Sequence, residues 1–193
     1  MAQRGPMPPK GGDEAIQEIH DRVDVEAGVL HRRHAGRLQC RRGCIDCCVD
    51  DITVFEIEAD HIRRHWSDLL EQGLPHPPGR CAFLDGDGAC RIYAQRPYVC
   101  RTQGLPLRWL EERDGVTVEL RDICHLNEAG DPIEELAAEE CWTLGPTEGV
   151  LAQAQAAAQT GEAQTGGADG PLRRVPLRQL FARSCPAAGA EPG

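Results

Sequence analysis

Apolar and polar positions follow one another along this chain with the spacing of two amphipathic helices separated by a short extended segment. The first helix begins near Asp13, which can cap it, and its apolar residues recur at intervals of three, four and seven positions. These residues are Ile16, Ile19, Val23 and Leu30. Residues 52–55 suit only an extended segment, and residues 56–70 then form a second helix that ends before Gly73. Its inward residues are Ile57, Ile62, Trp66 and Leu69.

Two β-hairpins are predicted where short apolar runs flank turn residues. The first joins residues 81–84 to residues 89–93 through the sequence Asp-Gly-Asp-Gly, and it would bring its two cysteines close together. The second joins residues 105–110 to residues 116–120 around an Asp-Gly pair. Both hairpins lie in the middle of the chain, where most of the aromatic residues also occur.

Two further helices are expected after the hairpins. Asp131 followed by Pro132 is typical of a helix start, and this helix should run through Cys141 toward Gly145. From Pro146 onward an Ala/Gln-rich stretch favours a helix, and the Gly/Pro-rich residues after it resemble a linker and a tail.

Composition narrows the class of protein. The net charge of −10, from 21 basic and 31 acidic residues, argues against nucleic acid and anionic membranes as partners. The chain has no apolar run long enough to span a bilayer and no apolar leader, so we expect a cytoplasmic protein. Ten cysteines in 193 residues are unusual for a cytoplasmic protein. Because cytoplasmic thiols stay reduced, structural disulfides do not explain them. Clustered cysteines in that compartment are typical of metal ligands or redox groups.

The densest cysteine cluster has the spacing C-x3-C-x2-C-C within nine residues. Its members are Cys40, Cys44, Cys47 and Cys48. Thiolates are soft ligands that prefer zinc, copper(I) or iron–sulfur clusters to magnesium or calcium. Because neighbouring side chains point apart in an extended segment, Cys47 and Cys48 predict either an irregular turn or two centres that share the cluster.

A second group of thiols follows the cluster. Cys81 and Cys90 lie on the first predicted hairpin, and Cys100 follows Pro97 in the first turn of a predicted short helix, where the helix dipole favours a thiolate. One tetrahedral site needs four ligands, and these two groups offer seven. Cys124 and Cys141 are weaker candidates that would add two more, and Cys185, in the expected tail, is interpreted as incidental.

Arginine is concentrated beside the cysteines of this acidic chain. The five residues are Arg41, Arg42, Arg91, Arg96 and Arg101. Their charge would offset an anionic thiolate centre, and Arg96 and Arg101 are the candidates for that role around a bound cofactor. The alternative is a solvated surface in a chain that uses arginine almost throughout in place of lysine.

Other residues of the chain offer site chemistries that compete with thiolate ligation. C-x3-C-x2-C is also the spacing of radical SAM enzymes, but the repeated βα units of their fold are missing here. The pairs His31 and His34, and His61 and His65, offer imidazole ligands, against the simpler interpretation of exposed helix histidines. The Asp-Gly-Asp-Gly segment lacks the later ligands of a calcium loop and is interpreted as a turn.

These motifs together resemble the YkgJ-type cysteine-cluster family, a zinc- or iron-chelating domain with a CxxCxxCC signature. The matching segments are Cys40–Cys48, the extended stretch with Glu58-Ala59 after it, Cys81–Leu84, Gly88–Tyr93 and Arg96–Arg101. One departure is the three-residue spacer before Cys44, where the family name implies two. The resemblance implies chelation by the seven cysteines from Cys40 to Cys100. A related segment occurs in flagellin lysine-methylases, which implies that an iron–sulfur cluster is at least as suitable as zinc.

The predicted protein is a cytoplasmic chelator of zinc or iron, the latter as an ion or an iron–sulfur cluster, with no assigned protein partner. The alternatives are an iron–sulfur-dependent group-transfer enzyme, such as a protein lysine methyltransferase, and a metal reservoir or chaperone. The expected fold class is α+β, in one small, irregular, metal-stapled domain with several helices and short hairpins. Metal would be structural as well, because eight aromatic residues supply few large core side chains. The expected parts are a disordered N-terminus (1–12), the cysteine-cluster domain with the first helix (13–145), and an Ala/Gly/Pro-rich helix and flexible tail (146–193).

Overall fold

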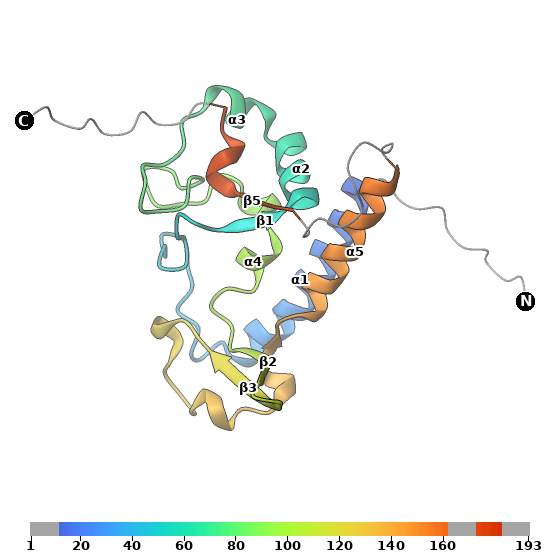
Figure 1. Ribbon diagram of the computed structural model, residues 1–193. Helices are drawn as coiled ribbons and strands as arrows, with labels where there is room; N and C mark the ends of the chain where they lie inside the picture. Colours follow the sequence, from blue (N-terminus) through green and yellow to red (C-terminus); the bar gives the residue numbers. More distant parts are fainter. Residues whose placement is uncertain (1–11, 162–172, 183–193) are drawn as a thin grey trace, which may run out of the picture.

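A computed structural model describes residues 12–161 and 173–182 of the chain (Figure 1). It contains the helices α1 (Gly12–Arg33), α2 (Glu56–His65), α3 (Ser67–Gln72), α4 (Tyr98–Arg101) and α5 (Pro146–Gly161). The strands are β1 (Thr53–Phe55), β2 (Leu107–Arg113), β3 (Val116–Asp122), β4 (Trp142–Thr143) and β5 (Arg174–Pro176). Short 3-10 turns are η1 (Tyr93–Gln95), η2 (His125–Asn127), η3 (Ile133–Glu135), η4 (Ala138–Glu140) and η5 (Leu177–Leu180). The predicted α+β class is confirmed.

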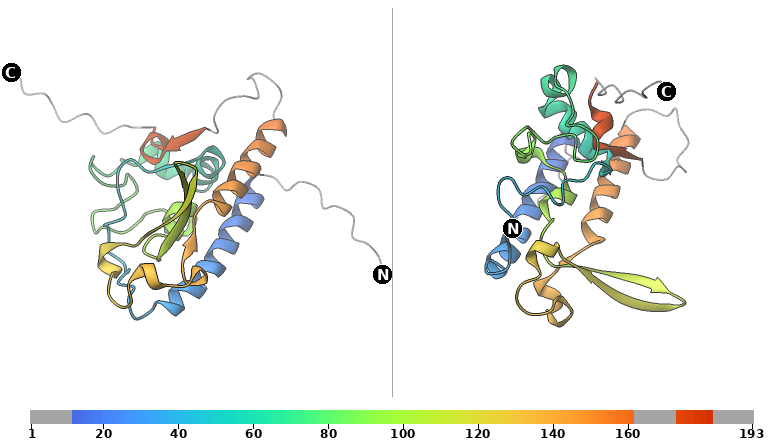
Figure 2. Two further views of the ribbon diagram at one scale, coloured as in Figure 1. Left: turned by 60° about the horizontal axis from the view of Figure 1, so that its bottom comes forward. Right: turned by 90° about the vertical axis from the view of Figure 1, so that its left-hand side faces the viewer.

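The long helix α1 lies beside α5 along one side of the molecule (Figures 1 and 2). All four apolar residues predicted for its inner face are buried, together with His20 and Ala27. They pack with Leu151 of α5, Tyr98 of α4 and Trp142 of β4 in one of two apolar cores. The stretch after Pro146 therefore contributes buried side chains to the body of the molecule.

The second core lies under α2, α3 and the antiparallel pair β1–β5. Val54 faces Val175 across the two strands, and both pack with Phe83 and Leu177. The single helix predicted for residues 56–70 is wrong in one respect, because it is broken at Trp66, whose backbone φ of −132° interrupts the helix between α2 and α3. The break lets Leu70 enter this core.

The hairpin predicted around Asp114 and Gly115 is confirmed as β2 and β3. Both turn residues have positive φ, 53° and 78°, which suits a two-residue turn. This hairpin projects from the body (Figure 2, right). The other predicted hairpin is reduced to one bridge between Leu84 and Cys90, because the Asp85 carboxylate accepts the backbone N–H groups of its own turn.

The helix predicted from Asp131 toward Gly145 is wrong. The segment forms η3, η4 and the strand β4, which pairs in parallel with β2. The guanidinium group of Arg121 donates to the carbonyl oxygens of Ile133 (2.6 Å) and Leu136 (2.5 Å), which a continuous helix would need for its own hydrogen bonds. Leu136 itself is extended, with ψ of 142°. A side chain from β3 thus overrides the local helix signal.

Within the described residues, none of the helices combines the length and the apolar character that a membrane crossing requires.

Candidate metal centre

The loop that carries the first four cysteines contains neither helix nor strand. Two tight turns close it, through hydrogen bonds of 2.9 Å from Cys44 N to Arg41 O and from Cys48 N to Ile45 O. Gly43 has a φ of 86°, which a residue with a side chain rarely adopts. The loop therefore follows the irregular path that the adjacent residues Cys47 and Cys48 predict. This path lets the thiols of one short loop face two different groups of cysteines.

One set of thiols, named here the inner group, lies near enough to Cys100 of α4 for their charges to interact. Its members are Cys48, Cys81, Cys90 and Cys100, from four separate segments of the chain. A backbone bond of 2.9 Å from Cys81 N to Cys48 O ties two of these segments together. Burial raises the pKa of Cys100, and the nearby thiols of Cys81 and Cys90 raise it further. Burial is also the main cause that raises the pKa of Cys81 and of Cys90.

The other set, named here the outer group, consists of Cys40, Cys44 and Cys124. Burial raises the pKa of Cys124, and the proximity of the other two thiols adds to it. Asn127, which is fully buried, holds this corner together: its Nδ2 lies 2.8 Å from Gly104 O and 3.4 Å from Cys40 Sγ. Its Oδ1 accepts the N–H of Gln39 at 2.7 Å. Sequence reasoning missed Asn127, since nothing in its local sequence distinguishes it.

Cys47 lies between the two groups. Its thiol contributes to the raised pKa of Cys100 in the inner group and of Cys124 in the outer group. A hydrogen bond from the Cys48 thiol lowers the pKa of Cys47 to about 7, although burial acts in the opposite direction. The same hydrogen bond is the largest cause that raises the pKa of Cys48. One thiol of this adjacent pair is therefore poised to ionise while the other stays protonated.

The structure gathers these eight cysteines without placing them at coordination distances. In the described part of the chain, no three cysteine sulfurs lie within 4.8 Å of one another. All nine described cysteines are free thiols. Cys141 lies apart from the rest, buried with its sulfur 3.9 Å from Arg121, and Cys185 is outside the described residues. The donor set of reduced, soft sulfur atoms fits zinc or iron and does not fit a hard cation.

The arginines beside the cysteines differ in where their charges lie. Arg91 and Arg96 lower the pKa of Cys90, against the larger effect of burial, so their charges reach the inner group. Arg101 is buried and donates to Asp24 (2.5 Å), to the Arg96 carbonyl (2.8 Å) and to the Ala94 carbonyl (3.0 Å). Its guanidinium group therefore fixes the segment before α4 onto α1. A direct charge role for Arg96 and Arg101 at a cofactor stays a prediction.

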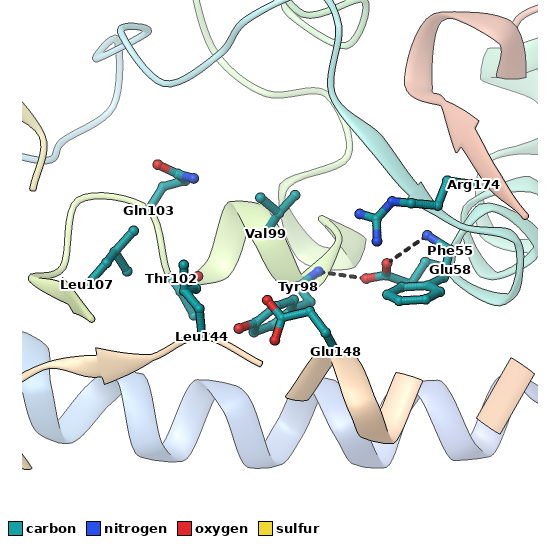
Figure 3. A pocket seen from close by; sticks show the side chains of 10 residues that line it. All are labelled: Phe55, Glu58, Tyr98, Val99, Thr102, Gln103, Leu107, Leu144, Glu148 and Arg174. Carbon is teal, nitrogen blue, oxygen red and sulfur yellow. Dashed lines mark hydrogen bonds between the residues drawn. The ribbon is translucent and has the colours of Figure 1, made fainter. Parts of the chain in front are cut away.

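A buried carboxylate fixes the start of α4. Glu58 is 3% exposed and accepts the backbone N–H groups of Tyr98 (2.7 Å) and Phe55 (3.2 Å), as Figure 3 shows. It borders a cavity of about 160 Å³ whose polar lining includes Glu148 and Arg174. A carboxylate at the first turn of α4 also acts favourably on the helix dipole. Glu58 thereby positions the helix that carries Cys100.

The central part of the chain matches a known protein family. Residues 39–126 match the family model CxxCxxCC, described as a "putative zinc- or iron-chelating domain". The match covers 88 of the 193 residues. The domain includes every cysteine of the inner and outer groups, while Cys141 lies outside it. The family predicted from the resemblance is thus confirmed. Searches of the curated proteins and of the solved structures found no match.

Proposed function

We propose that the CxxCxxCC domain chelates zinc or iron through thiolates at two neighbouring centres. One centre uses the inner group, and the other uses the outer group together with Cys47. The observation that carries this proposal is the gathering of eight free thiols, from distant parts of the chain, into two adjacent sets of four. Four sulfur ligands complete a tetrahedral zinc site or hold an iron–sulfur cluster.

The electrostatics of the inner group support cation binding. The negative charge that forms when one of its thiols ionises disfavours ionisation of the other thiols. A divalent cation or a cationic cluster core removes this repulsion and offsets the negative thiolate charge that burial penalises. The same reduced thiols suit a cytoplasmic protein.

Other residues of the chain position one ligand of each centre, Cys100 in the inner group and Cys40 in the outer group. Glu58 and Arg101 hold α4, and hence Cys100, through backbone and α1 contacts that do not involve any cysteine. Asn127 holds Cys40 against Gly104. When bound, the metal would supply Lewis acidity or, as a cluster, electron transfer.

The test is the metal and acid-labile sulfide content of protein purified without oxygen. The wild-type chain should contain zinc or iron bound at both centres, and Cys100→Ala should lose the inner one. Cys141→Ala is the control, because Cys141 is a buried cysteine beside Arg121 and outside both groups, and it should keep the full content. Equal metal content in both variants would overturn the proposal, as would a wild-type chain without bound metal. Sulfide in amounts near those of iron would identify a cluster.

Exposure also favours a second candidate function, metal delivery from the outer centre. Cys40 and Cys47 are exposed, whereas Cys81 of the inner group is buried. An ion in the outer centre is thus open to exchange with an acceptor. A chelator should remove that share of the metal rapidly while the far-ultraviolet circular dichroism stays unchanged. Loss of both centres at one common rate would contradict a separate delivery site.

A further inference from the structure

Three metal-ligating side chains meet where the start of α1 packs against α2, and none is a cysteine. His61 Nδ1 lies 2.7 Å from Asp13 Oδ1, and His65 Nε2 lies 3.4 Å from Asp13 Oδ2. Each of the three residues offers one ligand atom, and these atoms lie within 4.8 Å of one another. The two imidazole rings are 4.4 Å apart between centroids.

The spacing is close to that of ligands around one ion. Metal bonds of about 2.1 Å to nitrogen or carboxylate oxygen place tetrahedral ligand atoms about 3.4 Å apart. The contact from Asp13 to His65 already has this length, and the contact from Asp13 to His61 needs to open by about 0.7 Å. The two histidines are four residues apart on α2, so they share one face of the helix.

Burial gives the cluster a closed side and an open side. His61 is 1% exposed and its Nε2 is buried without a hydrogen-bond partner, whereas Asp13 and His65 are 31% and 39% exposed. The His20 ring lies edge-on to His61 on the closed side. The guanidinium group of Arg64 lies 3.0 Å from Asp13 Oδ1 on the open side and competes for the carboxylate. A bound ion would have to displace Arg64, whose 58% exposed side chain is free to swing into solvent.

We propose that Asp13, His61 and His65 bind a divalent cation of the zinc class, with the remaining coordination positions open to solvent. Two imidazoles and one carboxylate suit zinc or iron(II) and leave room for water or a small ligand. The site uses no thiol, so it goes beyond the proposed chelation by cysteines. An ion here would join the first turn of α1 to α2 and stabilise their packing.

The test is a titration of Zn²⁺ into the anaerobic, metal-loaded protein after removal of excess metal, followed by calorimetry. The wild-type chain should bind one further Zn²⁺ per molecule and gain thermal stability. His65→Gln and Asp13→Asn should each weaken this binding by about 100-fold or more, since even the groups that merely orient metal ligands account for 10- to 100-fold. Glu14→Gln is the matched control, because it removes an exposed charge next to Asp13 without removing a ligand.

Arg64→Gln separates the metal site from a plain ion-pair cluster. Removing this competing cation should tighten Zn²⁺ binding, while an ion-pair cluster would only lose one contact. Absence of additional Zn²⁺ in the wild-type chain, or equal binding by the wild type and His65→Gln, would overturn the proposal. The metal and sulfide content of the His65→Gln chain, measured before the titration, reports on the thiolate centres alone. Failure of the cysteine proposal is therefore distinguishable from failure of this one.

Discussion

Substitution of Gly104 by alanine tests whether Cys40 is a metal ligand. Gly104 lies between α4 and β2 with a φ of 88°, and a Cβ atom built on it would lie 2.4 Å from Cys40 Sγ. Ordinary contacts begin at 3.4 Å, so the sulfur must move by at least 3.4 − 2.4 = 1.0 Å. Metal–ligand distances tolerate deviations of about 0.2 Å. The substitution should therefore remove Cys40 from any coordination sphere.

The backbone cost of this substitution has a matched control. Any residue other than glycine in the left-handed region costs about 1–2 kcal/mol. Gly115, in the turn of the β2–β3 hairpin, has a similar φ of 78°, and a Cβ atom there would find nothing within 4 Å. Gly115→Ala should thus show the strain alone. Only Gly104→Ala should combine that strain with displacement of Cys40.

The assay is metal content per chain together with urea unfolding of both variants. Both should lose about 1–2 kcal/mol from backbone strain, and only Gly104→Ala should lose metal from the outer centre. Retention of the full wild-type metal content by Gly104→Ala would refute the assignment of Cys40 as a ligand.

Two further predictions concern the inner group. Because burial raises the pKa of Cys81, Cys90 and Cys100 above that of an ordinary thiol, these thiols must release protons to bind metal, and zinc affinity should rise with pH. Chelator competition from pH 6 to pH 9 should show this rise without flattening near pH 9, and flattening there would indicate unshifted thiols. Replacement of Glu58 by glutamine should cost about 1.5–3 kcal/mol in urea unfolding, because glutamine keeps only one acceptor oxygen and leaves one of two buried backbone N–H groups facing an NH2 donor. The exposed control Glu71→Gln should stay within about 0.5 kcal/mol of the wild type, and so would Glu58→Gln if this reasoning were wrong.

Local signals were sufficient to predict much of the fold. The apolar stripe of α1 and the Asp114-Gly115 turn act over a few residues, and both were correct. The helix expected after Asp131 failed because Arg121, ten or more residues earlier, captures the carbonyl oxygens of that segment. The break at Trp66 likewise depends on the packing of Leu70 of α3 in the second core. The helical spacing of the residues in this segment does not predict that packing.

The candidate site was predictable in composition but not in arrangement. Spacing alone identified the cysteines and the prospect of two centres, since adjacent thiols diverge. It did not indicate that Cys124 joins Cys40 and Cys44, because that grouping depends on η2 folding back onto the cysteine loop. Besides its neighbour Phe55, Glu58 binds Tyr98, 40 residues away, and Asn127 binds partners 23 and 88 residues away, so no local pattern identifies their positioning roles.

Burial along the chain determines how metal and folding are coupled. Residues 38–53, which hold the first four cysteines, contain no buried side chain, whereas α1 buries six. Arg101 and Glu58 fix α4 through contacts that require no metal. Regions with few buried contacts open independently of the core, so metal removal should open the backbone of the cysteine loop and leave the helices closed. Hydrogen exchange of metal-free protein should show lost protection near residues 40–48 and retained protection in α1. Equal loss in α1 would instead support metal as the staple of the whole body, which the small number of aromatic residues predicts.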